Sequence, residues 1–181
     1  IRFCDWSSDV CSSDLLRRGE PHVSTLDIDK VLADAVVVLR PLIAARRIAL
    51  TVSAPQSGPA VLGDSVQLQQ VIINLVWNAA EAIAETGRTD GRIDLWARLS
   101  ASGEEFAFGV RDNGAGVAAE QVATLFEPLS TSRLEGVGLG LSISKSIVEA
   151  HGGRIWLSAN EPGRTEFQFT LPVAARQASQ E

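Results

Sequence analysis

The residues best placed to do chemistry lie in a helix that the sequence predicts over residues 64–85. Its polar positions recur at spacings of three or four, so they share one helix face. They are Gln67, Gln70, Asn74, Asn78, Glu81 and Glu85. Such a stripe is the ordinary solvated face of an amphipathic helix. Asparagine is a mediocre helix former, however, and its carbonyl oxygen is a hard, neutral ligand. The alternative reading is therefore a Mg²⁺ site completed by phosphates and water.

A second group is the run Asp112-Asn113-Gly114-Ala115-Gly116, which directly follows a predicted strand. Aspartate, asparagine and glycine all favour turns, so one reading is a strand-ending turn. The other reading is a base-binding site. An ionised aspartate only accepts hydrogen bonds, so Asp112 can receive the exocyclic amino group of adenine. Gly114 and Gly116 carry no Cβ, which lets the backbone approach a flat ring.

Residues 136–142 (GVGLGLS) are rich in glycine and lead into a predicted helix. Unpaired N–H groups at the start of a helix form a site for phosphate oxygens. The run is not a dinucleotide fingerprint, because Leu141 stands where the third glycine is required, and it lacks the Gly-Lys-Ser/Thr of a Walker A loop. A glycine-rich hinge with no chemical role remains the alternative.

The segment before this run, residues 126–133 (FEPLSTSR), is interpreted as a mobile lid anchored by Phe126. Its hydroxyl groups and the guanidinium of Arg133 can meet phosphate. An exposed loop with unremarkable side chains is the alternative.

The elements that must position these groups follow from hydrophobic periodicity. We predict helices over residues 25–44, 64–85, 118–126 and 139–151, and strands over residues 48–54, 92–99, 105–111, 154–159 and 165–171. Thr25 or Asp27 can cap the first helix, and Asp64 the second. This order predicts an α/β (α+β) two-layer sandwich, with helices packed on one face of a mixed β-sheet.

The composition narrows the function classes. The chain has 181 residues, of which 45% are hydrophobic, and a net charge of −6. These values are typical of one globular domain. The acidic charge argues against nucleic acid or an anionic membrane as a partner. We see no signal peptide, and no apolar stretch approaches the roughly 20 residues of a membrane span.

The N-terminal residues look foreign to the rest of the chain. Residues 5–15 (DWSSDVCSSDL) resemble a translated sequencing adapter and show neither helical nor strand periodicity. Both cysteines, Cys4 and Cys11, lie in this part and form no metal or disulfide framework. We expect residues 1–15 to be a disordered artefact and exclude them from reasoning about the fold.

Four motifs occur in order along the chain: NLVWNAAEA, DNGAG, FEPLSTSR and GVGLGLSIS. Together they resemble the nucleotide-binding domain of sensor histidine kinases, the Bergerat or GHKL ATP-binding fold. The resemblance covers roughly residues 26–172. The short lid and the SISKSIVEAHGG stretch are most similar to nitrogen-regulation and oxygen-sensing kinases.

The resemblance implies a function. It implies a domain that uses ATP and Mg²⁺ and transfers the γ-phosphoryl group to a histidine for relay to a response regulator receiver domain. The expected partners are that receiver and the dimerisation domain that carries the histidine. The expected location is the bacterial cytoplasm, with a parent protein that can be membrane-anchored and a domain that itself makes no membrane contact.

The resemblance also assigns roles to residues. Asn78 is expected to bind Mg²⁺, with Asn74 one turn earlier near the phosphates. Asp112 is expected to hold the adenine amino group. The other implied nucleotide contacts are Gly114, Gly116, Phe126, Thr131, Gly136, Gly138, Gly140 and Leu141. The implied catalytic residues are Asn74, Asn78 and Arg133.

Three positions depart from the family pattern. Leu129 stands where the family often has phenylalanine, and Arg133 where it often has lysine, which changes the geometry of the charged group in the lid. ATP-hydrolysing members such as gyrase carry a general-base glutamate four residues before the metal-binding asparagine, where this chain has Asn74. An amide cannot act as that base, so the sequence favours phosphotransfer to a protein group over hydrolysis.

The family's phosphoacceptor histidine, in a motif like HExxxP, is not found here. The two histidines, His22 and His151, lie outside such a motif, and we expect both to be structural. We therefore expect residues 16–25 to be a linker, 26–173 the catalytic domain and 174–181 a flexible tail, with no autophosphorylation by the chain alone. Two other readings remain open: a serine kinase of the anti-sigma type or a GHKL hydrolase, and a nucleotide-binding interaction module without transfer.

Overall fold

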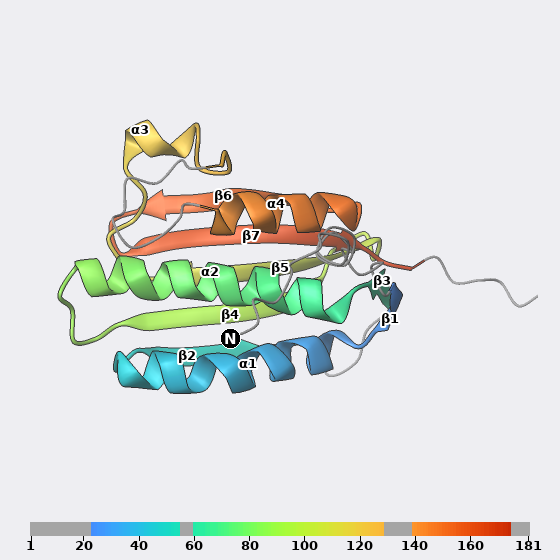
Figure 1. The fold of residues 1–181 in the computed structure, drawn as a ribbon, viewed down its shortest axis with the longest axis horizontal. Helices are drawn as coiled ribbons and strands as arrows, with labels where there is room; N and C mark the ends of the chain where they lie inside the picture. Colours follow the sequence, from blue (N-terminus) through green and yellow to red (C-terminus); the bar gives the residue numbers. More distant parts are fainter. Residues whose placement is uncertain (1–22, 55–59, 129–138, 175–181) are drawn as a thin grey trace, which may run out of the picture.

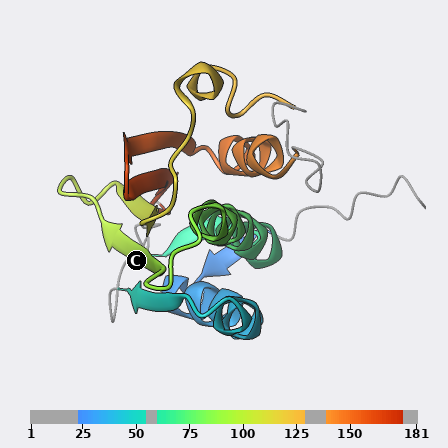
Figure 2. The ribbon, with the colours of Figure 1, turned by 90° about the vertical axis from the view of Figure 1, so that its left-hand side faces the viewer.

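The computed structural model describes residues 23–54, 60–128 and 139–174, which form two layers (Figure 1). The strands are β1 (Ser24–Leu26), β2 (Ala49–Ser53), β3 (Val61–Gly63), β4 (Arg92–Leu99), β5 (Glu105–Asp112), β6 (Arg154–Glu161) and β7 (Arg164–Pro172). The helices are α1 (Ile28–Ala45), α2 (Ser65–Glu85), α3 (Ala119–Val122) and α4 (Gly140–Ala150). In Figure 2, α1, α2 and α4 lie side by side on one face of the strands.

The main sheet has the strand order β2-β4-β5-β7-β6, and β1 pairs with β3 in a separate two-stranded sheet. The β2–β4 pair is parallel and the other pairs of the main sheet are antiparallel. The predicted mixed sheet with helices on one face is therefore confirmed.

The alternation of residues along the strands explains why helices cover only one face. On β4, Ile93, Leu95 and Ala97 are buried, whereas Arg92, Asp94 and Arg98 are exposed. Such alternation is typical of a sheet with one face packed on the core and the other in water.

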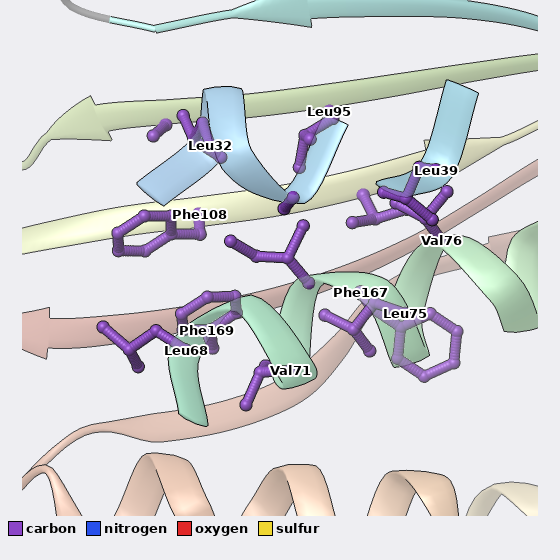
Figure 3. Close-up of a cluster of buried hydrophobic side chains, with 14 of the residues drawn as sticks. Leu32, Leu39, Leu68, Val71, Leu75, Val76, Leu95, Phe108, Phe167 and Phe169 are labelled. Carbon is purple, nitrogen blue, oxygen red and sulfur yellow. The ribbon is translucent and has the colours of Figure 1, made fainter. Parts of the chain in front are cut away.

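The core lies between the helices and this apolar face (Figure 3). Leu68, Val71 and Leu75 of α2 are buried against it, as are Phe108 of β5 and Phe169 of β7. The rings of Phe108 and Phe169 stack with their centroids 4.5 Å apart. α2 is the middle helix of the layer, between α1 and α4 (Figure 2).

The helix starts follow their capping residues. The Asp64 carboxylate accepts hydrogen bonds from the backbone N–H groups of Val66 and Gln67, and Asp27 caps α1 in the same way. The prediction that the first helix begins at residue 25 was wrong, because Ser24–Leu26 pairs with Val61–Gly63 as β1. The third helix was predicted too long, since α3 ends at Val122 and is followed by turns.

His151 joins the end of α4 to the start of α2. Its Nδ1 donates to the Ile147 carbonyl oxygen at 2.8 Å, and its Nε2 accepts from the Asp64 N–H at 3.0 Å. This pair of bonds fixes a neutral imidazole with the proton on Nδ1, because Nε2 acts as the acceptor. A Cβ at Gly63 would lie 2.7 Å from the His151 ring, so the ring requires glycine at that position.

Candidate functional site

The polar stripe of α2 is not uniformly solvated. Gln70 and Glu85 are exposed, whereas Asn74 and Asn78 are half-buried. The Asn78 side-chain nitrogen is buried and has no hydrogen-bond partner among the described residues. A buried amide without a partner costs free energy and calls for an explanation. The solvated-face reading therefore fits Gln70 and Glu85 and not the two asparagines.

Asn74 links α2 to the first turn of α4. Its side-chain nitrogen donates to the Gly140 carbonyl oxygen at 3.3 Å and to Ser144 Oγ at 3.4 Å. Ser144 is fully buried and donates in turn to the Gly140 carbonyl oxygen. The first turn of α4 is thus fixed beside the asparagine face of α2.

The start of α4 has the features expected of an anion site. Its N-cap residue, Leu139, makes no side-chain capping bond, so the first N–H groups receive no acceptor from that side chain. Gly140 leaves room at this point, since among the described residues a Cβ there would meet only the Asn74 side chain, at 3.9 Å. Leu141 is half-buried and packs against the core. The start of an 11-residue helix whose N-cap side chain makes no capping bond favours negative charge.

Asp112 ends β5 with a buried carboxylate. The residue is 3% exposed, and its Oδ1 accepts from the Gly114 N–H at 2.8 Å. Burial raises the pKa of Asp112 from 3.8 to about 6, and the Gly114 N–H opposes that rise. The carboxyl group is therefore mostly ionised at pH 7 and is held in a place that excludes water.

Gly114 and Gly116 are required for different reasons. A Cβ at Gly114 would lie 2.6 Å from the backbone carbon of Ala82, so this glycine allows the loop to pack on α2. Gly116 has φ of +84°, which L residues with side chains rarely adopt. The sequence argument, which gave both glycines the role of admitting a flat ring, missed the helix contact.

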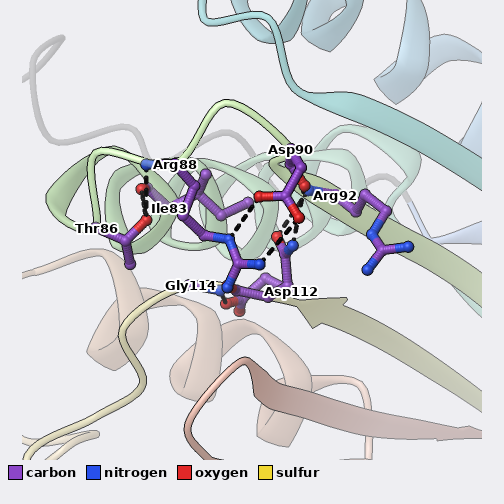
Figure 4. Close-up of polar contacts among 8 residues, drawn as sticks. Ile83, Thr86, Arg88, Asp90, Arg92, Asp112 and Gly114 are labelled. Carbon is purple, nitrogen blue, oxygen red and sulfur yellow. Dashed lines mark hydrogen bonds and ion pairs between the residues drawn. The ribbon is translucent and has the colours of Figure 1, made fainter.

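A network of polar contacts fixes the loop after Asp112 (Figure 4). The Asn113 side chain accepts from the Arg92 N–H and donates to the Asp90 carbonyl oxygen. Arg88 pairs with Asp90 at 2.9 Å and donates to the Asn113 carbonyl oxygen. The loop between α2 and β4 thereby holds the residue next to Asp112 in place.

Thr165 is a residue that the sequence argument missed. It pairs with Asp112 across β5 and β7, is 2% exposed, and its hydroxyl has no partner within the described part of the chain. A buried hydroxyl beside a buried carboxylate suits a polar ligand group or a bridging water. Nothing in the local sequence marks Thr165, because threonine is common in strands.

The lid residues are only partly visible. Phe126 is half-buried, and its ring meets that of Phe167 edge-on at 6.4 Å. This contact agrees with an anchoring role at the base of the lid. The predicted site residues Thr131, Arg133, Gly136 and Gly138 lie outside the described residues, as do Leu129, His22 and the turn at residues 55–59.

Residues 23–54, 60–128 and 139–174 contain no group of three His, Cys, Asp or Glu side chains arranged to hold a metal ion. None of the helices in these ranges is long and apolar enough to cross a membrane.

Comparison with known families matches residues 63–175 to the family described as histidine kinase-, DNA gyrase B- and HSP90-like ATPase. Among curated proteins, the sensor histidine kinase TmoS of Ectopseudomonas mendocina is 32% identical to this chain over 96% of the length of this chain. The chain is 36% identical to the C4-dicarboxylate transport sensor protein DctS of Rhodobacter capsulatus over 88% of the length of this chain. The chain spans only 18% and 24% of these two proteins.

The solved structures to which the chain is similar include histidine kinases. The nucleotide-free catalytic domain of ThkA has a TM-score of 0.72 and 27% identity, covering 83% of this chain and 95% of that one. Full-length ShkA in complex with AMPPNP has a TM-score of 0.73 and 26% identity, and the match covers 86% of this chain and 32% of ShkA. ThkA in complex with the response regulator TrrA has a TM-score of 0.67 and 27% identity, and the match covers 83% of this chain and 42% of that one.

Proposed function

The chain belongs to the histidine kinase-, DNA gyrase B- and HSP90-like ATPase family, and on that premise we propose that it is the ATP-binding catalytic domain of a two-component sensor histidine kinase. Its reaction is transfer of the ATP γ-phosphoryl group to a histidine of a dimerisation domain. The P–O bond to ADP breaks and a P–N bond to the imidazole forms. The observation that carries the proposal is the uncapped start of α4 held by Asn74 beside Asn78.

Asp112 is the proposed adenine contact. Its buried, largely ionised carboxylate accepts from the exocyclic amino group of the base. The hydroxyl of Thr165, the partner of Asp112 on β7, is available to the same ring or to a water beside it. Gly114 and Gly116 keep the adjoining backbone close to this site. The ShkA complex with AMPPNP supports a nucleotide as the ligand of this fold.

The triphosphate is proposed to lie between the start of α4 and the asparagine face of α2. Gly140 and Leu141 supply backbone N–H groups, and Asn74 holds that turn in place. Phe126 anchors the lid, whose Thr131, Arg133, Gly136 and Gly138 are proposed to close over the phosphates. Positioning and charge neutralisation are the main contributions of the protein in such a transfer.

The residues present fit Mg²⁺. Asn78 offers a neutral, hard amide oxygen, and its buried side-chain nitrogen has no hydrogen-bond partner among the described residues. Mg²⁺ is usually held by one or two protein ligands together with substrate phosphates, which agrees with the lack of a carboxylate cluster in the described ranges. When bound, the ion would neutralise phosphate charge.

The phosphoacceptor is proposed to lie on another domain. Both ring nitrogens of His151 are occupied by hydrogen bonds within the fold, so His151 is not a free nucleophile. The partners are then a dimerisation domain carrying the histidine and, after it, a response regulator receiver domain, as the ThkA complex with TrrA suggests. Because ATP is a cytoplasmic substrate, we place the domain in the cytoplasm.

The test is to mix residues 16–181 with a separately prepared dimerisation domain of a related kinase and [γ-³²P]ATP. We expect acid-labile phosphate on the dimerisation domain and none on the chain incubated alone. Acid-stable phosphoserine on an added protein would instead support the serine-kinase reading. ATP binding without any transfer would support the interaction module.

A further inference from the structure

Asn160, on β6, holds the loop that follows Asp112. Its Oδ1 accepts from the Val117 N–H at 2.8 Å, and its Nδ2 donates to the Val117 carbonyl oxygen at 2.8 Å. One side-chain amide thus satisfies both backbone groups of Val117, as a neighbouring strand would. Val117 lies in a stretch of loop without regular structure, between β5 and α3.

A β-bulge turns Asn160 toward this loop. Leu157 pairs with Phe167 and Ala159 with Glu166, so Ser158 is an extra residue in β6. Side chains alternate between the faces of a sheet, and without the extra residue Asn160 would point to the face away from the helices. With it, Asn160 pairs with Thr165, which itself pairs with Asp112. The three residues form a row across β5, β7 and β6 on the helix-covered side.

Within the loop, Gly116 is the residue whose backbone lies against this row. A Cβ on Gly116 would lie 3.0 Å from Asn160 Oδ1 and 3.7 Å from Thr165 Oγ1. The Asn160 contact therefore sets how closely the loop backbone approaches Thr165 and, through it, the end of β5 that carries Asp112.

We propose that Asn160 is a positioning residue for the base-binding site: it fixes the Gly116–Val117 backbone beside Asp112 and Thr165 before the nucleotide arrives. The proposal rests on the proposed function. A loop that is ordered in advance loses less conformational freedom on binding, so the ligand binds more tightly. Asn113 does the equivalent work at the other end of the loop, through its bonds to the backbone of Asp90 and Arg92.

The experiment compares two probes, Mg·ATP and Mg·tripolyphosphate, which has the phosphates but no base. The variant is Asn160→Ala, and the control is Thr51→Ala, which is also exposed and lies on β2 at the other edge of the sheet. We expect Asn160→Ala to weaken ATP binding about three- to tenfold and to leave tripolyphosphate binding unchanged. Asn160→Asp keeps the acceptor for the Val117 N–H and loses the donor to the Val117 carbonyl oxygen. Its ATP affinity is therefore expected to lie between those of wild type and Asn160→Ala.

Amide hydrogen exchange gives a second readout that needs no nucleotide. In Asn160→Ala the Val117 amide is expected to exchange faster than in wild type while amides of the core strands stay protected. If Asn160→Ala loses affinity equally for both probes, or loses none for either, the proposed role of Asn160 is overturned. The proposed function would still stand. If folded wild type fails to bind ATP at all, the proposed function falls and this inference falls with it.

Discussion

Asp112 is subject to two opposing requirements. Ligand binding asks for an ionised carboxylate, while burial raises its pKa from 3.8 to about 6 and so favours the neutral form. The folded state holds the proton more tightly than the unfolded state. The contribution of Asp112 to stability is therefore fully present below pH 3.8 and is lost as the pH rises through about 6.

The first prediction is that Asp112→Asn stabilises the fold at pH 7. The amide can still accept from the Gly114 N–H and carries no buried charge. We expect the free energy of unfolding to rise by about 1–3 kcal/mol at pH 7. Chemical denaturation at several pH values measures it. The difference from wild type should shrink toward zero at pH 4, and a variant less stable than wild type at pH 7 would contradict this account.

A variant of Asn74 tests whether the polar face of α2 is functional or only solvated. Asn74→Ala removes the bonds to Gly140 and Ser144, so the first turn of α4 is held less firmly. We expect the Kd for Mg·ATP to rise about three- to tenfold. Gln70→Ala, one turn earlier on the same stripe and exposed, is the control and should leave the Kd unchanged. If the stripe were only a solvated face, the two variants would bind alike.

At the scale of elements, the α2–α4 pair is held at both ends. Asn74 joins the start of α4 to the middle of α2, and His151 joins the end of α4 to the start of α2. The residues that we propose for the phosphates lie at the first of these contacts. The second lies at the opposite end of α4 and is structural, as the sequence suggested for His151.

We therefore predict that His151→Ala lowers stability with little effect on nucleotide affinity. The variant leaves the Asp64 N–H without its acceptor, which should cost about 1–3 kcal/mol in the free energy of unfolding. Glu149→Ala removes only an exposed ion pair with Lys145 and should change it by less than about 1 kcal/mol. Thermal or urea denaturation gives the comparison. A tenfold loss of ATP affinity in His151→Ala, at a temperature where it is folded, would show that the two ends of α4 are coupled.

At the scale of the whole molecule, the two-layer sandwich and nearly all of its elements could be predicted from periodicity and caps. Asp27 and Asp64 mark the helix starts, and the alternation on β4 marks the uncovered face. β1 and β3 could not be predicted, because strands of three residues carry no period and depend on a partner about 37 residues away.

The site was predictable to a different degree. Asn74 and Asn78 stood out because asparagine is a mediocre helix former, and Asp112 because it begins an Asp-Asn-Gly run directly after a strand. Thr165 and Asn160 did not, since their roles come from register: the β5–β7 pairing places Thr165 beside Asp112, and a bulge at Ser158 turns Asn160 toward the loop. A bulge has no reliable signature in a single sequence.

The central claim is that this fold binds ATP through Asp112. The most direct test is a calorimetric titration of Mg·ATP into residues 16–181, with Asp112→Asn in parallel. The account predicts that wild type binds and that the variant binds about ten- to a hundredfold more weakly, because a charged acceptor for the adenine amino group is lost. A folded wild type that does not bind, or a variant that binds equally well, would contradict it.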